Sequence, residues 1–134
     1  MALIEHPPSV VLLVGEAERL VVVRQLRAGA GRDVLELPAG TYEAGETAVQ
    51  CADRELAEEC GLCVARWTEL GSFWAAPAYS TEKVTVLAGE SSGTATATPD
   101  PDESIVVERI RAEGAALRLE DATSLAALAL AGLG

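Results

Sequence analysis

The sequence predicts an α/β fold, with a mixed β-sheet covered by helices in a single domain that comprises residues 1–134. Two observations support this prediction. Short runs of β-branched and other apolar residues alternate along the chain with two segments of helical character, an order typical of layered α/β domains. The chain has 134 residues, of which 49% are hydrophobic, and that is enough for one hydrophobic core, with no second domain apparent.

Strands are expected to make up the first part of the chain. Residues 1–8 form a short tail that ends in two prolines, and residues 10–14 are a β-branched apolar run. Residues 15–19 have the composition of a turn and residues 20–26 form a second apolar run, so the pair predicts a β-hairpin. A further strand over residues 34–38 then leads into the most distinctive stretch of the sequence.

Strands and a long loop are expected in the second half. Residues 63–73 predict one strand, kinked around residues 68–69, and residues 82–88 predict another with alternating apolar residues. Pro77 marks the loop between them. Residues 89–103 are rich in Gly, Ser, Thr, Pro and Asp without periodicity, and they predict a mobile loop.

The C-terminal part of the chain is expected to end in a helix. Residues 104–110 predict a strand, and residues 111–119 are a weakly patterned connection. Asp121 or Thr123 then has the position of an N-cap for a terminal helix that runs to about Ala131.

Three carboxylates share one face of the other predicted helix, which Gly61 is expected to end as a C-cap. At about 100° per residue, Glu58 and Glu59 fall within about 60° of Glu55. Like charges at these spacings repel by a few tenths of a kcal/mol per pair, and a divalent cation offsets such repulsion. The helix carries an apolar stripe on its opposite arc, made up of Val49, Ala52, Leu56 and Cys60.

This stretch resembles the Nudix box over residues 40–62. The resemblance is carried by Gly40, by Glu46, and by the run from Arg54 to Gly61 at the family's spacing. The alternative is an ordinary solvated acidic helix face, which the agreement of glycines, arginine and spacing disfavours. The resemblance implies a Nudix-type α/β/α sandwich and a hydrolase of nucleoside diphosphates linked to another moiety, with Mg²⁺ or Mn²⁺ as cofactor.

Flanking segments are similar to the ADP-ribose pyrophosphatase branch of that family. They are residues 23–27, residues 35–40 and residues 77–82, and Pro77 stands fifteen residues after Leu62. The resemblance implies ADP-ribose or another ADP-sugar as substrate. It also implies a homodimer, although almost nothing precedes Val10, where members of this branch carry a longer N-terminal sheet region.

The resemblance assigns roles residue by residue. It implies metal ligation by the Ala39 carbonyl and by three carboxylates, Glu55, Glu58 and Glu59. It implies a part in catalysis for Glu46, Arg54, Glu58 and Glu103, and substrate contacts for Arg27, Gly40 and Glu82. Metal ions bridging the diphosphate neutralise charge and lower the pKa of bound water.

Some of these assignments have ordinary alternatives. Glu103 lies in an acidic loop where the branch often places its catalytic base, and the alternative is a solvated loop carboxylate. For Arg27 the alternative is an exposed arginine at a strand end. The aromatic residues Trp67, Phe73 and Trp74 are candidates for stacking on a base, and in a sequence with 4% aromatic residues they are equally expected in the core.

The three cysteines indicate a reduced chain rather than a disulfide framework. Cys60 and Cys63 form a C-x-x-C pair, but a zinc site needs a second ligand pair, and the single histidine, His6, is distant in sequence. We expect Cys51, Cys60 and Cys63 to serve packing.

Composition excludes some partners. The net charge of −11 argues against nucleic-acid polymers, whose phosphates require basic surface, and no apolar run approaches a membrane span. No secretory signal is visible, so a cytoplasmic location is expected.

The expected partner is a small-molecule nucleotide. Other Nudix substrates, such as a modified nucleoside triphosphate or a different nucleotide sugar, remain alternatives, as does a non-catalytic sensor, although sensors commonly have damaged boxes.

Overall fold

The computed structural model describes residues 2–97 and 104–134, in which the chain forms eight strands, two α-helices and one short 3-10 helix. The strands are β1 (Ser9–Glu16), β2 (Arg19–Arg27), β3 (Arg32–Glu36), β4 (Ala39–Thr41), β5 (Leu62–Val64), β6 (Thr68–Trp74), β7 (Lys83–Thr94) and β8 (Ile105–Arg111). The helices are α1 (Ala48–Cys60), η1 (Ala115–Leu117) and α2 (Ala122–Leu130).

The strands form one mixed sheet, as predicted. Its central pair is β1 and β7, which run parallel from Ser9 opposite Val84 to Gly15 opposite Glu90. β1 also pairs antiparallel with β2 at the predicted hairpin, and β2 pairs antiparallel with β3 and β8. The short strand β4, which the sequence did not predict, pairs with the start of β1.

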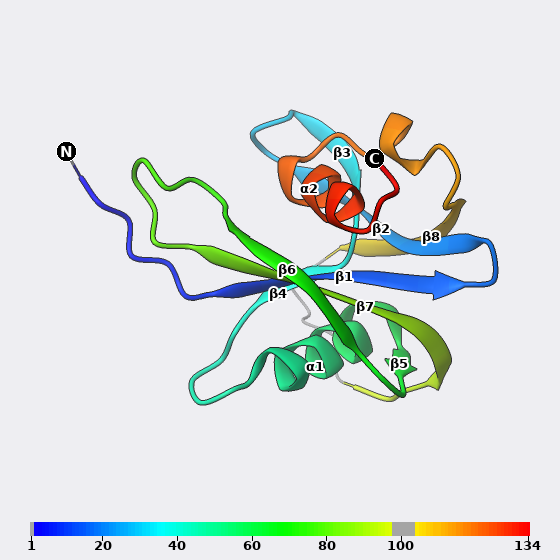
Figure 1. The fold of residues 1–134 in the computed structure, drawn as a ribbon. Coiled ribbons are helices and arrows are strands. Elements are labelled where there is room, and N and C mark those ends of the chain that lie inside the picture. Colours follow the sequence, from blue (N-terminus) through cyan, green and yellow to red (C-terminus); the bar gives the residue numbers. More distant parts are fainter. Residues whose placement is uncertain (1, 98–103) are drawn as a thin grey trace.

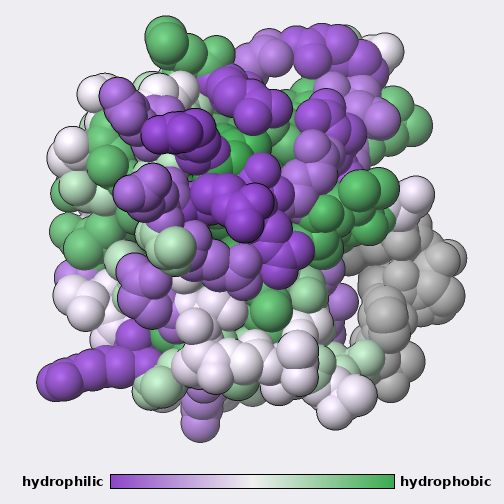
Figure 2. Space-filling view, turned by 90° about the vertical axis from the view of Figure 1, so that its right-hand side faces the viewer, coloured by the Kyte–Doolittle hydropathy of each residue, from purple (hydrophilic) through white to green (hydrophobic). Residues whose placement is uncertain are grey.

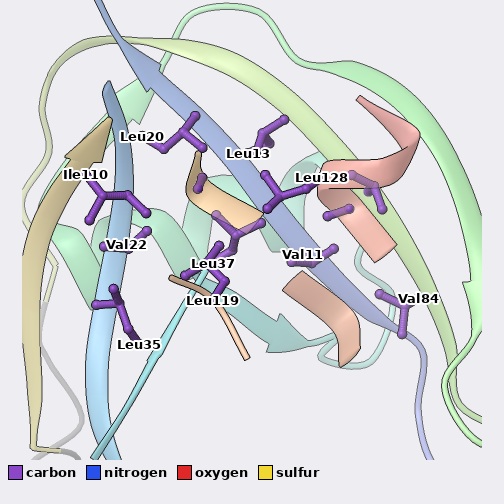
Figure 3. Packing of buried hydrophobic residues seen from close by; sticks show 13 residues of the cluster. Val11, Leu13, Leu20, Val22, Leu35, Leu37, Val84, Ile110, Leu119 and Leu128 are labelled. Atoms are coloured by element: carbon purple, nitrogen blue, oxygen red, sulfur yellow. The ribbon is translucent and has the colours of Figure 1, made fainter. Parts of the chain in front are cut away.

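The two α-helices cover opposite faces of the sheet, which confirms the α/β/α sandwich (Figure 1). Alternate residues of β1 face opposite layers because successive side chains of a strand point to opposite sides. Val11 and Leu13 pack in the cluster on the α2 side, whose members Figure 3 shows (Val11, Leu13, Leu20, Val22, Leu35, Leu37, Val84, Ile110, Leu119 and Leu128 are labelled). Val10, Leu12 and Val14 pack with Cys51, Ala52 and Leu56 of α1.

Local signals correctly predicted the C-cap of α1 and the N-cap of α2, whereas the N-cap of α1 was not predicted. Thr47 is the N-cap of α1 and forms a capping box with Gln50. Gly61 is the C-cap, and its φ of 67° lies in the left-handed region that favours glycine. Asp121 caps α2 by accepting a hydrogen bond from the Ser124 N–H.

Two sequence predictions about the second half were wrong in part. Residues 63–73 form two strands, β5 and β6, because the chain leaves the sheet at residues 65–67, before the predicted kink. Residues 89–94 belong to β7 and not to a loop, because they find hydrogen-bonding partners in β1 and β5. Residues 95–97 lie outside any strand. Residues 98–103, the last part of that predicted loop, lie outside the described residues.

The end of the sheet that holds the β1–β2 turn has a surface of mixed polarity. Figure 2 views this end, and hydrophilic side chains spread across the upper part of the face.

Within the described residues, no helix is long and apolar enough to cross a membrane.

Candidate active site

The site is built where β4 passes against α1. At Gly40 a Cβ atom would lie 2.0 Å from Cδ of Glu55 and 2.4 Å from its Oε1. No side chain fits in that space, so glycine is required for the carboxylate of Glu55 to approach the backbone of β4. The sequence separates these residues by 15 positions, and the packing of α1 on the sheet brings them together.

Arg54 holds the carboxylates of this region in place. Its Nε and Nη2 donate to the two oxygens of Glu46 at 2.7 and 2.9 Å. Its Nη1 donates to Glu55 at 2.8 Å and to Glu58 at 3.3 Å, and Nη2 also donates to the Thr41 carbonyl at 3.0 Å. One guanidinium therefore ties the loop before α1, strand β4 and two turns of the helix together.

The pKa values of two carboxylates respond to this arrangement in opposite directions. The hydrogen bonds from Arg54 lower the pKa of Glu46 to about 2, and the Glu43 backbone N–H, which donates to Glu46 at 2.7 Å, acts in the same direction. Burial raises the pKa of Glu55, against the lowering effect of Glu59 and Arg54. A cation near Glu55 would relieve the cost of keeping it charged.

A cavity of about 490 Å³ opens beside these residues. We call it the carboxylate cavity. Of the residues predicted for the site, it brings together Arg27, Ala39, Gly40, Arg54, Glu55 and Glu59, and it is also lined by Gln25, Thr41, Tyr42, Glu43 and Ile105. Gln25 and Arg27 reach it from β2 because they occupy the same face of that strand as Val21, which packs on the α1 side.

Glu58 does not line the carboxylate cavity, and its carboxylate accepts a hydrogen bond from Arg54 instead. Among residues 2–97 and 104–134 no three acidic, histidine or cysteine side chains are grouped closely enough to form a ready-made metal site. Three carboxylate residues do line the cavity, Glu43, Glu55 and Glu59, together with Ala39 and Gly40 of β4. These are oxygen donors, which suit Mg²⁺ and Mn²⁺, so the residues present fit such an ion.

Arg27 pairs with a carboxylate that the sequence analysis did not single out. Its Nε and Nη2 donate to the two oxygens of Glu36 at 2.7 and 2.9 Å. Glu36 is buried, with 8% of its surface exposed, while about half of the Arg27 side chain is exposed. A carboxylate placed within the apolar run Leu35 to Leu37 was the only signal in the sequence for this pair.

Glu82 lies in a second cavity, of about 310 Å³, that adjoins the first. We call it the Glu82 cavity. It shares four residues with the carboxylate cavity: Arg27, Ala39, Gly40 and Thr41. The Ser9 hydroxyl donates to Glu82 at 2.5 Å, and Nδ1 of His6 lies 3.9 Å from it. The structure thus places Glu82 next to the predicted site, with two partners that the sequence analysis did not assign to it.

The remaining predicted candidates lie elsewhere. Glu103 is outside the described residues. Trp67 packs in the core beside α1 and donates to Asp53 at 2.8 Å, and Phe73 packs in the core beside α2. Trp74 is exposed, with the Lys83 ammonium 4.3 Å from the centre of its ring.

The three cysteines are free thiols. Cys51 is buried in the core beside α1 and Cys60 packs against that core, partly buried, as expected; burial raises the pKa of each to about 12. A thiol with so high a pKa is a poor nucleophile and a poor metal ligand at neutral pH.

A larger cavity, of about 620 Å³, lies at the opposite end of β1. Its lining includes Leu13, Gly15, Arg19, Arg66 and Glu90. It contains none of the residues predicted for the site.

Comparison with known proteins agrees with this geometry. A family model described as NUDIX domain matches residues 5–129. The chain is 32% identical over 124 residues to the ADP-ribose pyrophosphatase of Bacillus subtilis, an alignment that covers 92% of this chain and 64% of that protein. The chain therefore spans less than two thirds of the length of this relative.

Two further matches are shorter or more distant in sequence. The ADP-ribose pyrophosphatase of Escherichia coli strain K12 is 34% identical over 82 residues, which cover 58% of this chain and 39% of that protein. A crystal structure of an ADP compounds hydrolase superposes with a TM-score of 0.86 at 23% identity, covering 93% of this chain and 70% of that chain. The match to the crystal structure shows the fold.

Proposed function

The chain belongs to the NUDIX domain family, and from this premise we propose that it hydrolyses the pyrophosphate bond of a nucleoside diphosphate linked to another moiety. ADP-ribose, or another ADP-sugar, is the proposed substrate. The observation that carries the proposal is the cavity in which Glu55 and Glu59 of α1 face the backbone of β4 across Gly40. The names of the bacterial relatives support the choice of ADP-ribose.

In this proposal, some residues of the chain would bind the metal ion and others would position those ligands. Glu55, Glu59 and the Ala39 carbonyl would hold a divalent cation, Mg²⁺ or Mn²⁺, with Glu58 alongside. When bound, that ion neutralises phosphate charge and makes water easier to deprotonate. Arg54 and Glu46 act as positioning residues, because their shared hydrogen bonds fix the direction of Glu55.

Substrate contacts are proposed for the two adjoining cavities. Arg27 lines both, and it is suited to phosphate oxygens because the guanidinium is a planar, permanently charged donor. Gly40 leaves room for the diphosphate next to Glu55. Glu82 is an acceptor for sugar hydroxyl groups in the smaller cavity.

A substrate panel tests the proposal. The purified protein is incubated with ADP-ribose, ADP-glucose, a nucleotide sugar of another base and a set of nucleoside triphosphates, each with Mg²⁺ or Mn²⁺. Mass spectrometry should show AMP and ribose 5-phosphate as the products from ADP-ribose. Efficient hydrolysis of triphosphates with ADP-ribose and ADP-glucose left intact would refute the substrate assignment and leave the family assignment standing.

The metal assignment has its own test. Glu59→Gln removes a ligand charge and keeps the shape of the side chain, so kcat should fall by about a hundredfold while the helix stays folded. Unchanged turnover of this variant at saturating Mg²⁺ would exclude Glu59 as a ligand.

Glu103 is proposed as the general base, which takes the proton of the attacking water. Glu103→Gln should lower kcat and leave metal affinity nearly unchanged, whereas Glu59→Gln removes a proposed metal ligand. Because Asp100 and Asp102 are close in sequence, a variant with all three neutralised is the decisive one. Full activity of that variant would assign the base to α1.

We also propose that the protein acts in the cytoplasm on a small-molecule nucleotide and assembles as a homodimer. Light scattering coupled to gel filtration measures the mass of the assembly directly. A mass of one chain across the micromolar range would refute the dimer.

A further inference from the structure

One edge of the Arg27 guanidinium donates hydrogen bonds to Glu36, and the opposite edge donates none to the residues that the structure describes. A guanidinium carries five N–H donors in a fixed plane. Nε and Nη2 of Arg27 donate to Glu36, and within the part of the chain that the structure describes no hydrogen bond is made by Nη1. The two N–H groups of Nη1 and the second N–H of Nη2 therefore form an unused edge next to the carboxylate cavity.

Arg54, the other described arginine that lines this cavity, has no such edge. Each of its three nitrogens donates to a carboxylate, and Nη2 also donates to the Thr41 carbonyl. Its side chain is 21% exposed, against 49% for Arg27. Of these two cations, Arg27 is the one with donors available to a ligand.

Glu36 is a rigid support for Arg27. It lies in β3, paired in register with Val23 of β2, and its side chain is 11% exposed. Both carboxylate oxygens are used by the same guanidinium, so the plane of that group is fixed as well as its position. The arginine side chain has many rotamers, and ordering it costs conformational entropy. Because Glu36 already holds Arg27 in one rotamer, a ligand binds without that cost.

We propose that Glu36 is a positioning residue for substrate binding. Its buried carboxylate fixes Arg27 so that the free edge of the guanidinium meets the phosphate oxygens of the substrate. This rests on the proposed function for the identity of the substrate, but the role of Glu36 requires only that a diphosphate group binds in the carboxylate cavity.

A double-mutant cycle on binding tests the proposal without any turnover. The probe is inorganic pyrophosphate with Mg²⁺, measured by isothermal titration calorimetry on wild type, Glu36→Gln, Arg27→Gln and the double variant. Each single variant should raise the Kd for pyrophosphate about tenfold, which corresponds to a loss of about 1.4 kcal/mol of binding free energy. The double variant should bind no more weakly than Arg27→Gln, because Glu36 acts through Arg27.

Glu108→Gln is the matched control. Glu108 pairs with Arg24 of β2 through the same two guanidinium nitrogens, Nε and Nη2, and neither residue lines the two cavities. This variant loses an arginine–carboxylate pair on the same strand, with a more exposed carboxylate, and should bind pyrophosphate as wild type does. Arg27→Lys is a second test variant: it keeps the charge and loses the planar edge, so it should bind about as weakly as Arg27→Gln.

Steady-state kinetics provide a second test of the role of Glu36. With ADP-ribose, Glu36→Gln should raise KM about tenfold and leave kcat within a factor of three, since the contact is present before and during the reaction. Thermal unfolding of each variant checks that the fold is kept, and if Glu36→Gln fails to fold, Arg27→Lys decides the question.

The outcomes separate the two proposals. If wild type binds pyrophosphate and Glu36→Gln weakens it only when Arg27 is present, the role of Glu36 stands even if no nucleotide in the panel is hydrolysed. An effect of Glu36→Gln that persists without Arg27 overturns the positioning role, and so does wild-type binding in Arg27→Lys. The role of Glu36 is also overturned if wild type does not bind pyrophosphate at all.

Discussion

At the scale of single residues, Gly40 is the described glycine at which an added Cβ makes the shortest contact. The site depends on the close approach of Glu55 to the β4 backbone, and a methyl group at Gly40 occupies that space. Glu55 is also held by Arg54, so it cannot move aside without breaking a 2.8 Å hydrogen bond. The glycine at the start of the box is therefore explained by packing against its own helix, in addition to any room it leaves for substrate.

We expect Gly40→Ala to lower the free energy of unfolding by about 1–3 kcal/mol, the usual range for overpacking. The displaced Glu55 should also reduce kcat by about 10–100-fold. Urea denaturation and steady-state kinetics measure the two effects. Gly29→Ala is the control, because a Cβ there meets no atom within 4 Å, and it should change neither quantity appreciably. Equal behaviour of the two variants would contradict the packing argument.

The Glu46–Arg54 pair predicts a stability that depends on pH. The pKa of Glu46 is lowered from 4.5 to about 2 in the folded protein. Its contribution is therefore complete above about pH 4.5 and is lost as the pH falls through 2. Unfolding free energies of wild type and Glu46→Gln, measured from pH 6 to pH 2, should differ most at the higher pH and converge below 4.5. A difference that is constant with pH would show that Glu46 does not titrate as described.

At the scale of elements, α1 is the part of the molecule that carries both chemistry and packing. One face buries Cys51, Ala52 and Leu56 against the sheet, and the other directs Glu55 and Glu59 into the carboxylate cavity. Its ends are fixed by the Thr47 capping box and by Gly61, so the register of the carboxylates against β4 is fixed as well.

Thr47→Ala is expected to lower the free energy of unfolding by about 1 kcal/mol, because it leaves a backbone N–H of the first turn without its acceptor. Turnover should fall by less than a factor of three, since the first turn lies two turns before Glu55. Chemical denaturation and kcat together test this. Thr96→Ala, outside any helix or strand, serves as the control and should have no effect on either. A loss of kcat as large as that expected for Gly40→Ala would mean that the cap positions the site directly.

At the scale of the whole molecule, the acidic character of the chain and the site are connected. The net charge is −11, and Glu43, Glu55 and Glu59 line one cavity, where self-repulsion opposes the compact state. A divalent cation that binds only the folded protein would stabilise it by mass action.

Mg²⁺ is accordingly expected to raise Tm, and the gain should correspond to about 2.7 kcal/mol when the ion is at a hundred times its Kd. Differential scanning calorimetry with and without chelator measures the shift. NaCl at equal ionic strength controls for screening and should give a much smaller change. The shift should be largely lost in Glu59→Gln. An equal shift in that variant would place the ion elsewhere.

Features of the site that depend on residues close in sequence could be predicted, and features that depend on residues far apart in sequence could not. Helical spacing brings Arg54, Glu55 and Glu59 to one side of α1, and all three line the carboxylate cavity. The C-cap at Gly61 was predicted correctly, because the left-handed conformation is a local preference. The pairing of Arg27 with Glu36 could not be predicted, because it arises from the way β2 and β3 are paired and how their side chains then face α1.

The sequence by itself determined the α/β class, the hairpin, the two helices with the C-cap of α1 and the N-cap of α2, and the family of the box. These follow from side-chain periodicity and from backbone preferences within a few residues. Only the tertiary structure decided that residues 89–94 extend β7, that β4 exists, and that two cavities meet at Arg27 and Gly40. The reason is that a strand is stabilised by hydrogen bonds to partners that are remote in sequence, and a cavity is formed by the packing of several elements. Such partners leave no local pattern, so they become visible only when the chain is folded.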